Sequence, residues 1–373
     1  MARERLAGGP VDAARALVGL HATDASTVFL SVAARTREPG VKVLERALYE
    51  DRTLVRMLGM RRTMFVVPVD VAPVVQAACT RAIAVQERKR TVQLFEQFGV
   101  TRDGDTWLAE VEEATMRALE AHGEATAAEL ARTEPRLAQQ IPMAVGKAYA
   151  GKLGVSTRVL FGLAAEGRIV RGRPRGSWIS TQYRWAPMDR WLDGGLPSLP
   201  TEAAQAELVR RWLAAFGPGT VDDLKWWTGL TMGEVRRAVA AVQAVEVDLD
   251  GATGLVQADD LEPVSRPEPW VGLLPALDPT PMGWTERAWY LGDLGPAVFD
   301  RSGNIGPTVW FDGRIVGGWA QRQNGEVAVR LLQDIGGEAS QQVEQAAGRL
   351  SDWLGQTRVT PRFRTPLERA LSS

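Results

Sequence analysis

The residues best suited to chemistry in this sequence lie together near its N-terminus, in the run His21-Ala22-Thr23-Asp24. A neutral imidazole, with a reference pKa of about 6.5, can accept a proton from water near neutral pH. The Thr23 hydroxyl can hydrogen-bond the same water, and the Asp24 carboxylate can offset a developing positive charge. Because His122 is the only other histidine, we expect any general acid–base chemistry at His21.

Two apolar patterns flank these residues, over 11–20 and 26–34. Apolar side chains recur there at helical spacing, which predicts a polar connection between two helices. A purely structural interpretation is also open. In it, His21 caps carbonyl groups at the end of the first helix, and Thr23 or Asp24 caps the start of the second.

The composition is typical of a globular protein. Of the 373 residues, 45% are hydrophobic and 24% are charged, and the length allows two or three domains. No apolar run approaches the roughly 20 residues that cross a bilayer. The single cysteine, Cys79, excludes an intrachain disulfide framework and a cysteine-rich zinc site. We find no cofactor fingerprint and no secretory signal, and we expect a cytoplasmic protein without metal or cofactor.

Charge is unevenly distributed along the chain, although the formal net charge is −1. Residues 151–190 contain eight Lys/Arg and two Asp/Glu, whereas residues 241–300 contain two and eleven. Most basic residues are arginines, whose planar guanidinium group suits phosphates and base edges. Basic surfaces on a neutral body predict a polyanionic partner.

Residues 1–70 have the pattern of a winged helix, and a helical connector is expected over 71–105. Three helical segments are followed by two short apolar strands, joined by a turn that contains Arg61 and Arg62. These two arginines are predicted to contact DNA. The alternative is that they are solvated at the tip of the hairpin.

An internal repeat predicts two further winged helices. Residues 117–130 and 211–224 align at a constant offset of 94 residues. Each copy has an amphipathic helix, a glycine at its end, a threonine N-cap and an acidic residue three positions later. This is the entry to a helix-turn-helix, which we expect over 106–195, with an insertion, and over 196–262. Two unrelated helix ends with ordinary caps are the alternative.

The wing of the second module is the most basic part of the chain. An arginine-rich wing tip suits a phosphate or the minor groove, although solvated arginines are again the alternative. The predicted DNA contacts of this wing are Arg171, Arg173, Arg175 and Arg184. Arg322, in the C-terminal part, is a further predicted contact.

Residues 263–373 predict a β-barrel or a strongly curved sheet with a C-terminal helix. Six short strands are expected, including 288–291 and 297–299, and Asp312-Gly313 is a typical hairpin turn. Tryptophans in these strands either belong to the core or line a groove. Asp278 either forms a turn or faces the DNA.

Several separated motifs occur in a fixed order: GLHATD, TVDDLKWWTGL, LLPALDPTPMGW and VFDRSGNIGPTVWFDGRIVGGW. In this order they resemble a bacterial winged-helix DNA-binding family of DNA glycosylases, the AlkZ- and AlkX-like proteins, over essentially the whole chain. The resemblance implies three tandem winged helices scaffolded by a C-terminal β-barrel. It also implies excision of alkylated bases, including bulky adducts or interstrand crosslinks.

The resemblance further implies a catalytic position. The motif of the family is Gln-X-Gln or Gln-X-Asp, in the loop after the first helix. His21 and Thr23 occupy its first and last positions, so this sequence departs from both versions. An N7- or N3-alkylated purine carries a positive charge that weakens its glycosidic bond. The enzyme must then hold the nucleotide, stabilise an oxocarbenium-like sugar and place a water molecule at C1′.

The sequence therefore predicts a monofunctional DNA glycosylase for alkylated purines. His21 would activate water, Thr23 would position it, and Asp24 would give electrostatic support. The expected partner is double-stranded DNA that carries alkylated bases, and a monomer is expected. The alternative is a non-catalytic winged-helix DNA-binding protein, either a transcriptional regulator or an adduct sensor. A regulator would normally dimerise on a palindromic site, and the sequence has no heptad pattern for a dimer helix.

Overall fold

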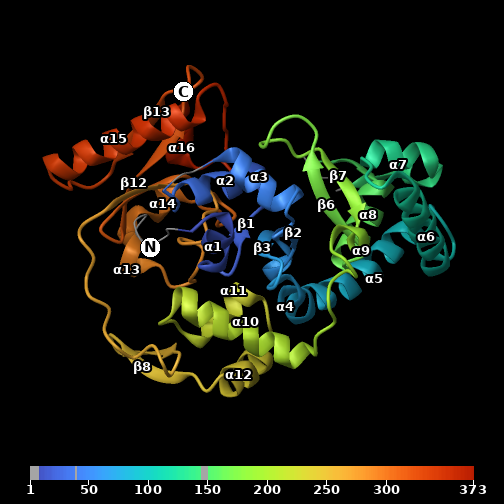
Figure 1. Cartoon of the computed structure of the whole chain (residues 1–373), viewed down its shortest axis with the longest axis horizontal. Helices are drawn as coiled ribbons and strands as arrows, with labels where there is room; N and C mark the ends of the chain where they lie inside the picture. The colour runs from blue at the N-terminus through green and yellow to red at the C-terminus, as the bar shows by residue number, and fades with distance from the viewer. Residues whose placement is uncertain (1–7, 38–39, 144–149) are drawn as a thin grey trace.

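The computed structural model describes residues 8–37, 40–143 and 150–373. The structure combines α-helices with several small antiparallel sheets (Figure 1), so the predicted α+β class is confirmed. None of the described helices is long and apolar enough to cross a membrane.

Three parts of the chain share one element order, in which three helices precede a two-stranded antiparallel hairpin. We call them the first, second and third units. The first contains α1 (Pro10–Arg15), α2 (Ala25–Ala33), α3 (Val41–Tyr49), β2 (Leu54–Leu58) and β3 (Met64–Pro68). The second contains α6 (Gly104–His122), α7 (Ala127–Thr133), α8 (Val155–Ala165), β6 (Ile169–Pro174) and β7 (Tyr183–Pro187). The third contains α10 (Thr201–Phe216), α11 (Val221–Thr228), α12 (Met232–Ala241), β8 (Val245–Leu249) and β9 (Ala252–Val256).

Shorter elements connect the units. The first and second are joined by α4 (Ala72–Val75), the π-helical turn η3 (Gln76–Thr80) and α5 (Arg81–Gln97). The insertion within the second unit contains the turn η4 (Pro135–Ala138), β4 (Gln140–Met143) and β5 (Gly151–Gly154), and the short helix α9 (Met188–Trp191) follows β7.

The repeat at an offset of 94 residues is confirmed in its local geometry. Thr126 and Thr220 each form a capping box, in which the threonine and the acidic residue three positions later accept each other's backbone N–H groups. The residues immediately before them, Ala125 and Gly219, each form a bridge with the closing strand of their own hairpin. The two copies therefore share tertiary contacts as well as a sequence pattern.

The C-terminal part is built on an open antiparallel sheet. Its strand order is β10 (Val271–Leu274), β11 (Thr308–Phe311), β12 (Arg314–Gln321) and β13 (Val327–Leu331). The described residues close no barrel. The Asp312-Gly313 turn between β11 and β12 is confirmed, because both residues have positive φ.

Two of the six predicted strands are wrong. Residues 288–291 form the helix α13 (Ala288–Leu291), and residues 297–299 overlap the helix α14 (Gly295–Val298), with the turn η5 (Gly292–Leu294) between them. Proline in the first turn of α14 suits a helix start and cannot donate to a strand ladder. The apolar runs are therefore short buried helices beside the sheet.

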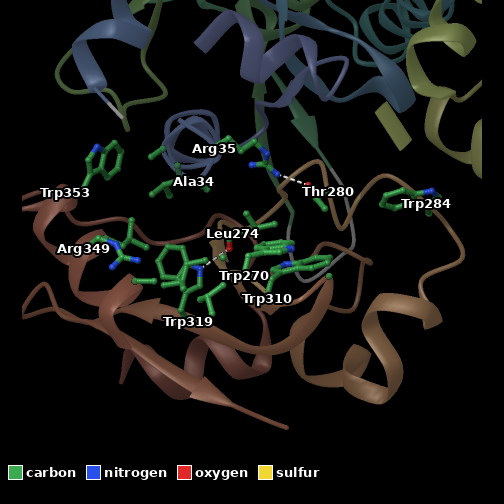
Figure 2. Close-up of a pocket in the computed structure, with 18 of the residues that line it drawn as sticks. Ala34, Arg35, Trp270, Leu274, Thr280, Trp284, Trp310, Trp319, Arg349 and Trp353 are labelled. Carbon is green, nitrogen blue, oxygen red and sulfur yellow. Dashed lines mark hydrogen bonds between the residues drawn. The ribbon is translucent and has the colours of Figure 1, made fainter. Parts of the chain in front are cut away.

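The helices α15 (Gly337–Leu354) and α16 (Pro366–Ser372) pack on this sheet. The indole of Trp319 in β12 donates to the carbonyl oxygen of Leu274 in β10 at 2.9 Å (Figure 2). Trp310 and Trp319 are buried, as expected of core residues, whereas Trp289 is 56% exposed.

A buried ion pair joins α2 to the C-terminal part. Arg35 donates from both terminal nitrogens to the Asp278 carboxylate, at 2.6 and 2.8 Å. The Ser31 hydroxyl donates to the same carboxylate at 2.7 Å. The Thr280 N–H donates to it at 3.0 Å, which forms a turn. Asp278 is fully buried and closed to solvent, and its bond to the Thr280 N–H confirms the turn-forming interpretation.

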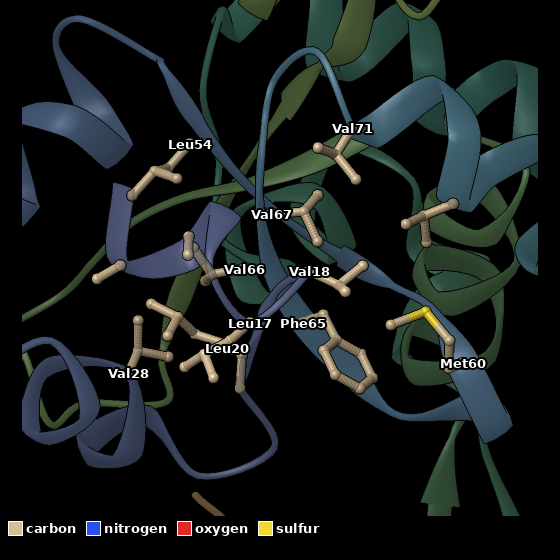
Figure 3. Close-up of a cluster of buried hydrophobic side chains, with 14 of the residues drawn as sticks. Leu17, Val18, Leu20, Val28, Leu54, Met60, Phe65, Val66, Val67 and Val71 are labelled. Carbon is tan, nitrogen blue, oxygen red and sulfur yellow. The ribbon is translucent and has the colours of Figure 1, made fainter. Parts of the chain in front are cut away.

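The first unit lies between the other parts of the chain (Figure 1). Its hairpin and helices enclose an apolar core that includes Leu17, Val28, Leu54 and Phe65 (Figure 3). The strand β1 (Leu20–His21) joins the edge of this hairpin and pairs antiparallel with β3.

This pairing corrects the expected helix over 11–20, because α1 ends at Arg15. Val18, with a φ of 61°, turns the chain away from the helix. A Cβ on Gly19 would lie 2.8 Å from Val67, so the glycine allows β1 to approach β3. His21 therefore lies between α1 and α2 as expected, but in a short strand of that connection.

Candidate active site

His21 is held in the interior beside the hairpin of the first unit. It is 4% exposed, and its ring lies 5.3 Å from that of Phe65, its partner in β3. Burial, followed by the charge of Arg61, lowers the pKa of His21 to about 3, and Asp278 offsets only part of this effect. The imidazole is thus neutral at physiological pH. Its Nδ1 has no hydrogen-bond partner among the described residues.

Thr23 follows His21 by two residues and shares this feature. Its Oγ1 is buried and has no partner in the described part of the structure. A buried polar atom without a partner costs about 1–3 kcal/mol. Both atoms are therefore free to hydrogen-bond a water molecule or a ligand.

Asp24 has a structural role at the start of α2. Its carboxylate accepts the backbone N–H of Ser26 at 3.0 Å and the Ser26 hydroxyl at 2.8 Å, so it is the N-cap of the helix. The other oxygen accepts the backbone N–H of Arg362 at 2.9 Å. Both oxygens of Asp24 are therefore occupied, as the structural interpretation anticipated.

A cationic cluster borders His21. The guanidinium carbon of Arg61 lies 3.8 Å from the ring centroid of Trp226, and that of Arg287 lies 4.9 Å from it. Burial, followed by the charge of Arg287, lowers the pKa of Arg61 to about 10. Burial also lowers the pKa of Arg287. The Nε of Arg287 donates to the Trp284 carbonyl at 3.0 Å, and the Asp223 carboxylate offsets part of its charge. The buried Nε of Arg61 has no hydrogen-bond partner among the described residues.

The backbone presents Arg61 at a tight turn. Arg61 and Arg62, in the turn η2 (Met60–Arg62) between β2 and β3, both have positive φ, 52° and 59°. Such values are uncommon for arginine. Gly229, at the end of α11, packs against this turn, and a Cβ there would lie 3.3 Å from the Arg61 nitrogen. Close packing by the third unit therefore fixes the strained turn.

Together these groups form a site with a defined chemical capacity. The neutral His21 imidazole can accept a proton from water. The adjacent Thr23 hydroxyl can orient that water, and the guanidiniums of Arg61 and Arg287 can bind a phosphate. Among the described residues, no three His, Cys, Asp or Glu side chains are grouped so that they could hold a metal ion.

The other predicted DNA contacts do not gather at this site. Most of them already have protein partners: Arg62 pairs with Glu87, Arg173 with Glu50 and Arg322 with Glu326, while Arg184 donates to the Glu124 carbonyl. Arg171 is packed over Trp185, and burial lowers its pKa to about 10. Arg175 is exposed near the end of the β6–β7 hairpin.

Sequence reasoning missed Trp226 and Arg287. Trp226 stands in the motif TVDDLKWWTGL, which contributed to the resemblance, but nothing in that motif indicated a contact with Arg61. Arg287 is one of only two basic residues over 241–300. An isolated arginine in an acidic stretch is the one local signal that could have singled it out.

Comparisons with known proteins agree on one family. The family model described as DNA glycosylase AlkZ-like matches residues 14–353. A curated relative from Streptomyces sahachiroi, named an interstrand DNA cross-link repair glycosylase, is 26% identical over 214 residues, which cover 55% of this chain and 57% of that protein. The matched segment thus spans little more than half of that relative.

The fold is also shared with a solved structure. The DNA glycosylase AlkZ of Streptomyces sahachiroi has a TM-score of 0.72 to this chain at 22% identity, over 97% of this chain and 95% of that one. The family match covers most of the sequence, and the structural match covers almost the full length. The chain therefore belongs to the family of AlkZ-like DNA glycosylases.

Proposed function

We propose that this protein is a DNA glycosylase that removes N7- or N3-alkylated purines from double-stranded DNA by attack of water at C1′. Membership of the AlkZ-like DNA glycosylase family supports the proposal that it hydrolyses the glycosidic bond. The observation that carries the proposal is the buried, neutral His21 with an unpaired Nδ1. Because the name of the Streptomyces relative refers to interstrand cross-link repair, we include bulky adducts and crosslinks among the substrates.

The proposed reaction needs no acid for the leaving group. When the bond between C1′ and the base nitrogen breaks, its electrons neutralise the positive charge of the alkylated base. An oxocarbenium-like sugar remains. The oxygen of a water molecule positioned by Thr23 then bonds to C1′, while one of its protons passes to His21 Nδ1. With its proton on Nε2, the neutral imidazole has a free acceptor at Nδ1.

The low pKa of His21 suits a late proton transfer. A base with a pKa of about 3 deprotonates bulk water poorly. It readily accepts a proton from a water whose oxygen has already bonded to C1′, because that oxygen is then positively charged. His21 would thus orient the water before attack and accept its proton afterwards.

We propose a positioning role for Asp24. As the N-cap of α2 it fixes the turn that carries Thr23, and its bond to the Arg362 N–H ties that turn to the C-terminal tail. Because the Ser26 N–H and hydroxyl and the Arg362 N–H already occupy its two oxygens, electrostatic support of the sugar by its charge would be a minor contribution.

We propose that Arg61 and Arg287 bind a phosphate that flanks the target nucleotide. The two partly buried guanidiniums repel each other, and Asp223 offsets only part of the positive charge, at Arg287. A bound anion would relieve that repulsion. The phosphate would raise the pKa of the nearby His21, which would make it a stronger base in the complex.

We propose that the three units are winged helices that grip the duplex. The exposed Arg175 would contact the backbone first. Arg62, Arg173, Arg184 and Arg322 would exchange their protein partners for phosphates. Arg171 would act indirectly, by holding the hairpin of the second unit against Met64 of the first. We expect the protein to act as a monomer in the cytoplasm.

The proposal is tested with duplex oligonucleotides that carry N7-methylguanine or a bulky N7 adduct. The expected result is release of the free base, detected by mass spectrometry, together with an alkali-labile abasic site. The alternative is a non-catalytic DNA-binding protein. Tight, damage-dependent binding without base release from either duplex would establish that alternative.

A further inference from the structure

A pocket of about 330 Å³ lies between the end of α2, the open sheet and α15 (Figure 2). This size falls in the range of small-molecule sites, which begins at about 300 Å³. It is separate from the site at His21. Asp24 caps the start of α2, whereas Ala33 and Ala34 at its far end line the pocket. Nine helical residues separate them by about 13 Å.

The walls of this pocket are unusually aromatic. Six of the lining residues are tryptophans: Trp270, Trp284, Trp289, Trp310, Trp319 and Trp353. Figure 2 shows that Trp270, Trp310 and Trp319 gather on the sheet, with Trp353 across from them on α15. Flat indole walls favour a flat ligand, because stacking needs extended planar contact.

Part of this aromatic surface is open to solvent. Trp289 is 56% exposed, although its ring contacts Trp284 at 5.0 Å and Tyr290 at 4.8 Å between centroids. Both contacts are edge-to-face. Gly272 in β10 makes room for the Trp270 ring, because a Cβ there would lie 2.8 Å from it. The site thus keeps space and indole surface that core packing would normally fill.

The charges at the pocket select against cations. None of the described residues that line it is acidic. The charge of Arg35 is neutralised by Asp278. Arg349, on α15, is exposed and has no ion-pair partner in the described part of the chain. Aromatic faces can also bind a cationic ligand, but the positive charge of Arg349 would repel a cation in this pocket. An anionic ligand would pair with it.

We propose that this pocket binds a planar aromatic acid, with its rings stacked on the tryptophans and its carboxylate at Arg349. The inference does not depend on glycosidic bond hydrolysis. The same chemistry has two sources: a free aromatic acid, or an aromatic acid carried by an adduct on DNA. Because α2 separates the pocket from His21, the pocket would hold a part remote from the alkylated base itself.

Isothermal titration calorimetry with three anthracene probes tests the proposal. The probes are anthracene carboxylate, the uncharged anthracene methanol and the cationic anthracene methylamine, which differ in charge but share the ring. We expect the carboxylate to bind at least tenfold more tightly than the amine. No binding of the carboxylate, or equal binding of all three probes, would overturn the proposal.

Two variants locate the binding. Trp289→Ala should weaken binding of the carboxylate probe about tenfold, because it removes an aromatic side chain on which the rings stack. Arg349→Gln should reduce carboxylate binding to that of the methanol. Both side chains are exposed, so folding is retained, and thermal unfolding verifies this. Arg330→Gln, an exposed β13 arginine outside the pocket, is the matched control. Unchanged affinity in both pocket variants would also overturn the proposal.

A second comparison identifies the source of the ligand. Binding is measured to duplexes with N7-methylguanine and with an N7 adduct that bears a tethered aromatic acid. If the adduct is the source, Trp289→Ala weakens binding only to the duplex that bears the tethered aromatic acid. If the ligand is a free molecule, the variant binds both duplexes as the wild type does. These outcomes are binding affinities and do not depend on base release. Failure of the glycosylase proposal would therefore be distinguishable from failure of the pocket proposal.

Discussion

His21 and Arg61 lie close enough that the charge of the guanidinium adds to the larger effect of burial, and the two lower the pKa of the imidazole to about 3. The turn that carries Arg61 belongs to the first unit, while the residues packed on it, Trp226 and Gly229, come from the third. The protonation state of His21 therefore depends on how two units meet.

The first prediction concerns this pKa directly. With only two histidines in the chain, NMR of isotope-labelled histidine gives two imidazole signals, and His122→Ala assigns them. The His21 signal should titrate near pH 3, far below the ordinary value of about 6.5. Arg61→Gln should raise that pKa, because it removes a positive charge. Titration of His21 between pH 6 and 7 in the wild type would contradict the burial described for it.

The second prediction follows from linkage. Between the unfolded pKa of about 6.5 and the folded pKa of about 3, the unfolded state binds a proton that the folded state does not. Stability should thus fall as the pH falls through this window, by about 1.4 kcal/mol per pH unit from His21 alone. Urea denaturation at several pH values should show that the unfolding free energy of His21→Gln falls less over this window than that of the wild type. Identical losses in both proteins would refute the linkage.

The third prediction concerns the buried ion pair between Arg35 and Asp278. Asp278→Asn should destabilise the protein by about 3–5 kcal/mol, because it leaves the Arg35 charge buried without a counter-charge. The exposed pair Arg46–Asp51 supplies the control, and Arg46→Gln should cost less than about 1 kcal/mol. Equal unfolding free energies for the two variants would show that Arg35 finds other compensation.

The fourth prediction separates capping from catalysis at Asp24. Asp24→Asn keeps an acceptor for the Ser26 N–H, so the excision rate should stay within about threefold of wild type. Asp24→Ala should lower stability by about 1 kcal/mol through loss of the cap. A hundredfold slower excision by a stable Asp24→Asn protein would instead assign its charge to the reaction.

The fifth prediction concerns the hairpin of the second unit. Arg175→Gln should weaken DNA binding and reduce the slope of log K against log salt by about one, as expected for one lost phosphate contact. Arg62→Gln should weaken DNA binding less, because Arg62 must break its ion pair with Glu87 before it can contact a phosphate. Fluorescence anisotropy at several salt concentrations measures both. A slope unchanged by Arg175→Gln would place this hairpin away from the DNA.

Local signals in the sequence predicted local structure well. The capping boxes at Thr126 and Thr220 and the turn at Asp312-Gly313 each depend on residues within a few positions of one another. The short apolar runs over 288–291 and 297–299 failed as strands, because periodicity cannot separate strands from helices at that length.

The site needed long-range information. The strand β1 exists only because β3, more than forty residues later, offers an edge to His21. The cluster of Arg61, Trp226 and Arg287 joins three distant parts of the chain. His21 was singled out by residue type and by the resemblance, but its burial and its low pKa follow from packing that no local pattern records.

Single-turnover excision of N7-methylguanine tests the central claim most directly. Wild type is compared with His21→Ala and with His122→Ala, the matched control at the other histidine, while DNA binding is measured in parallel. His21→Ala should slow base release by about 10²–10⁴-fold, the usual contribution of a general base, with DNA binding retained, and His122→Ala should match wild type. Base release by His21→Ala at the wild-type rate would contradict a catalytic role for His21.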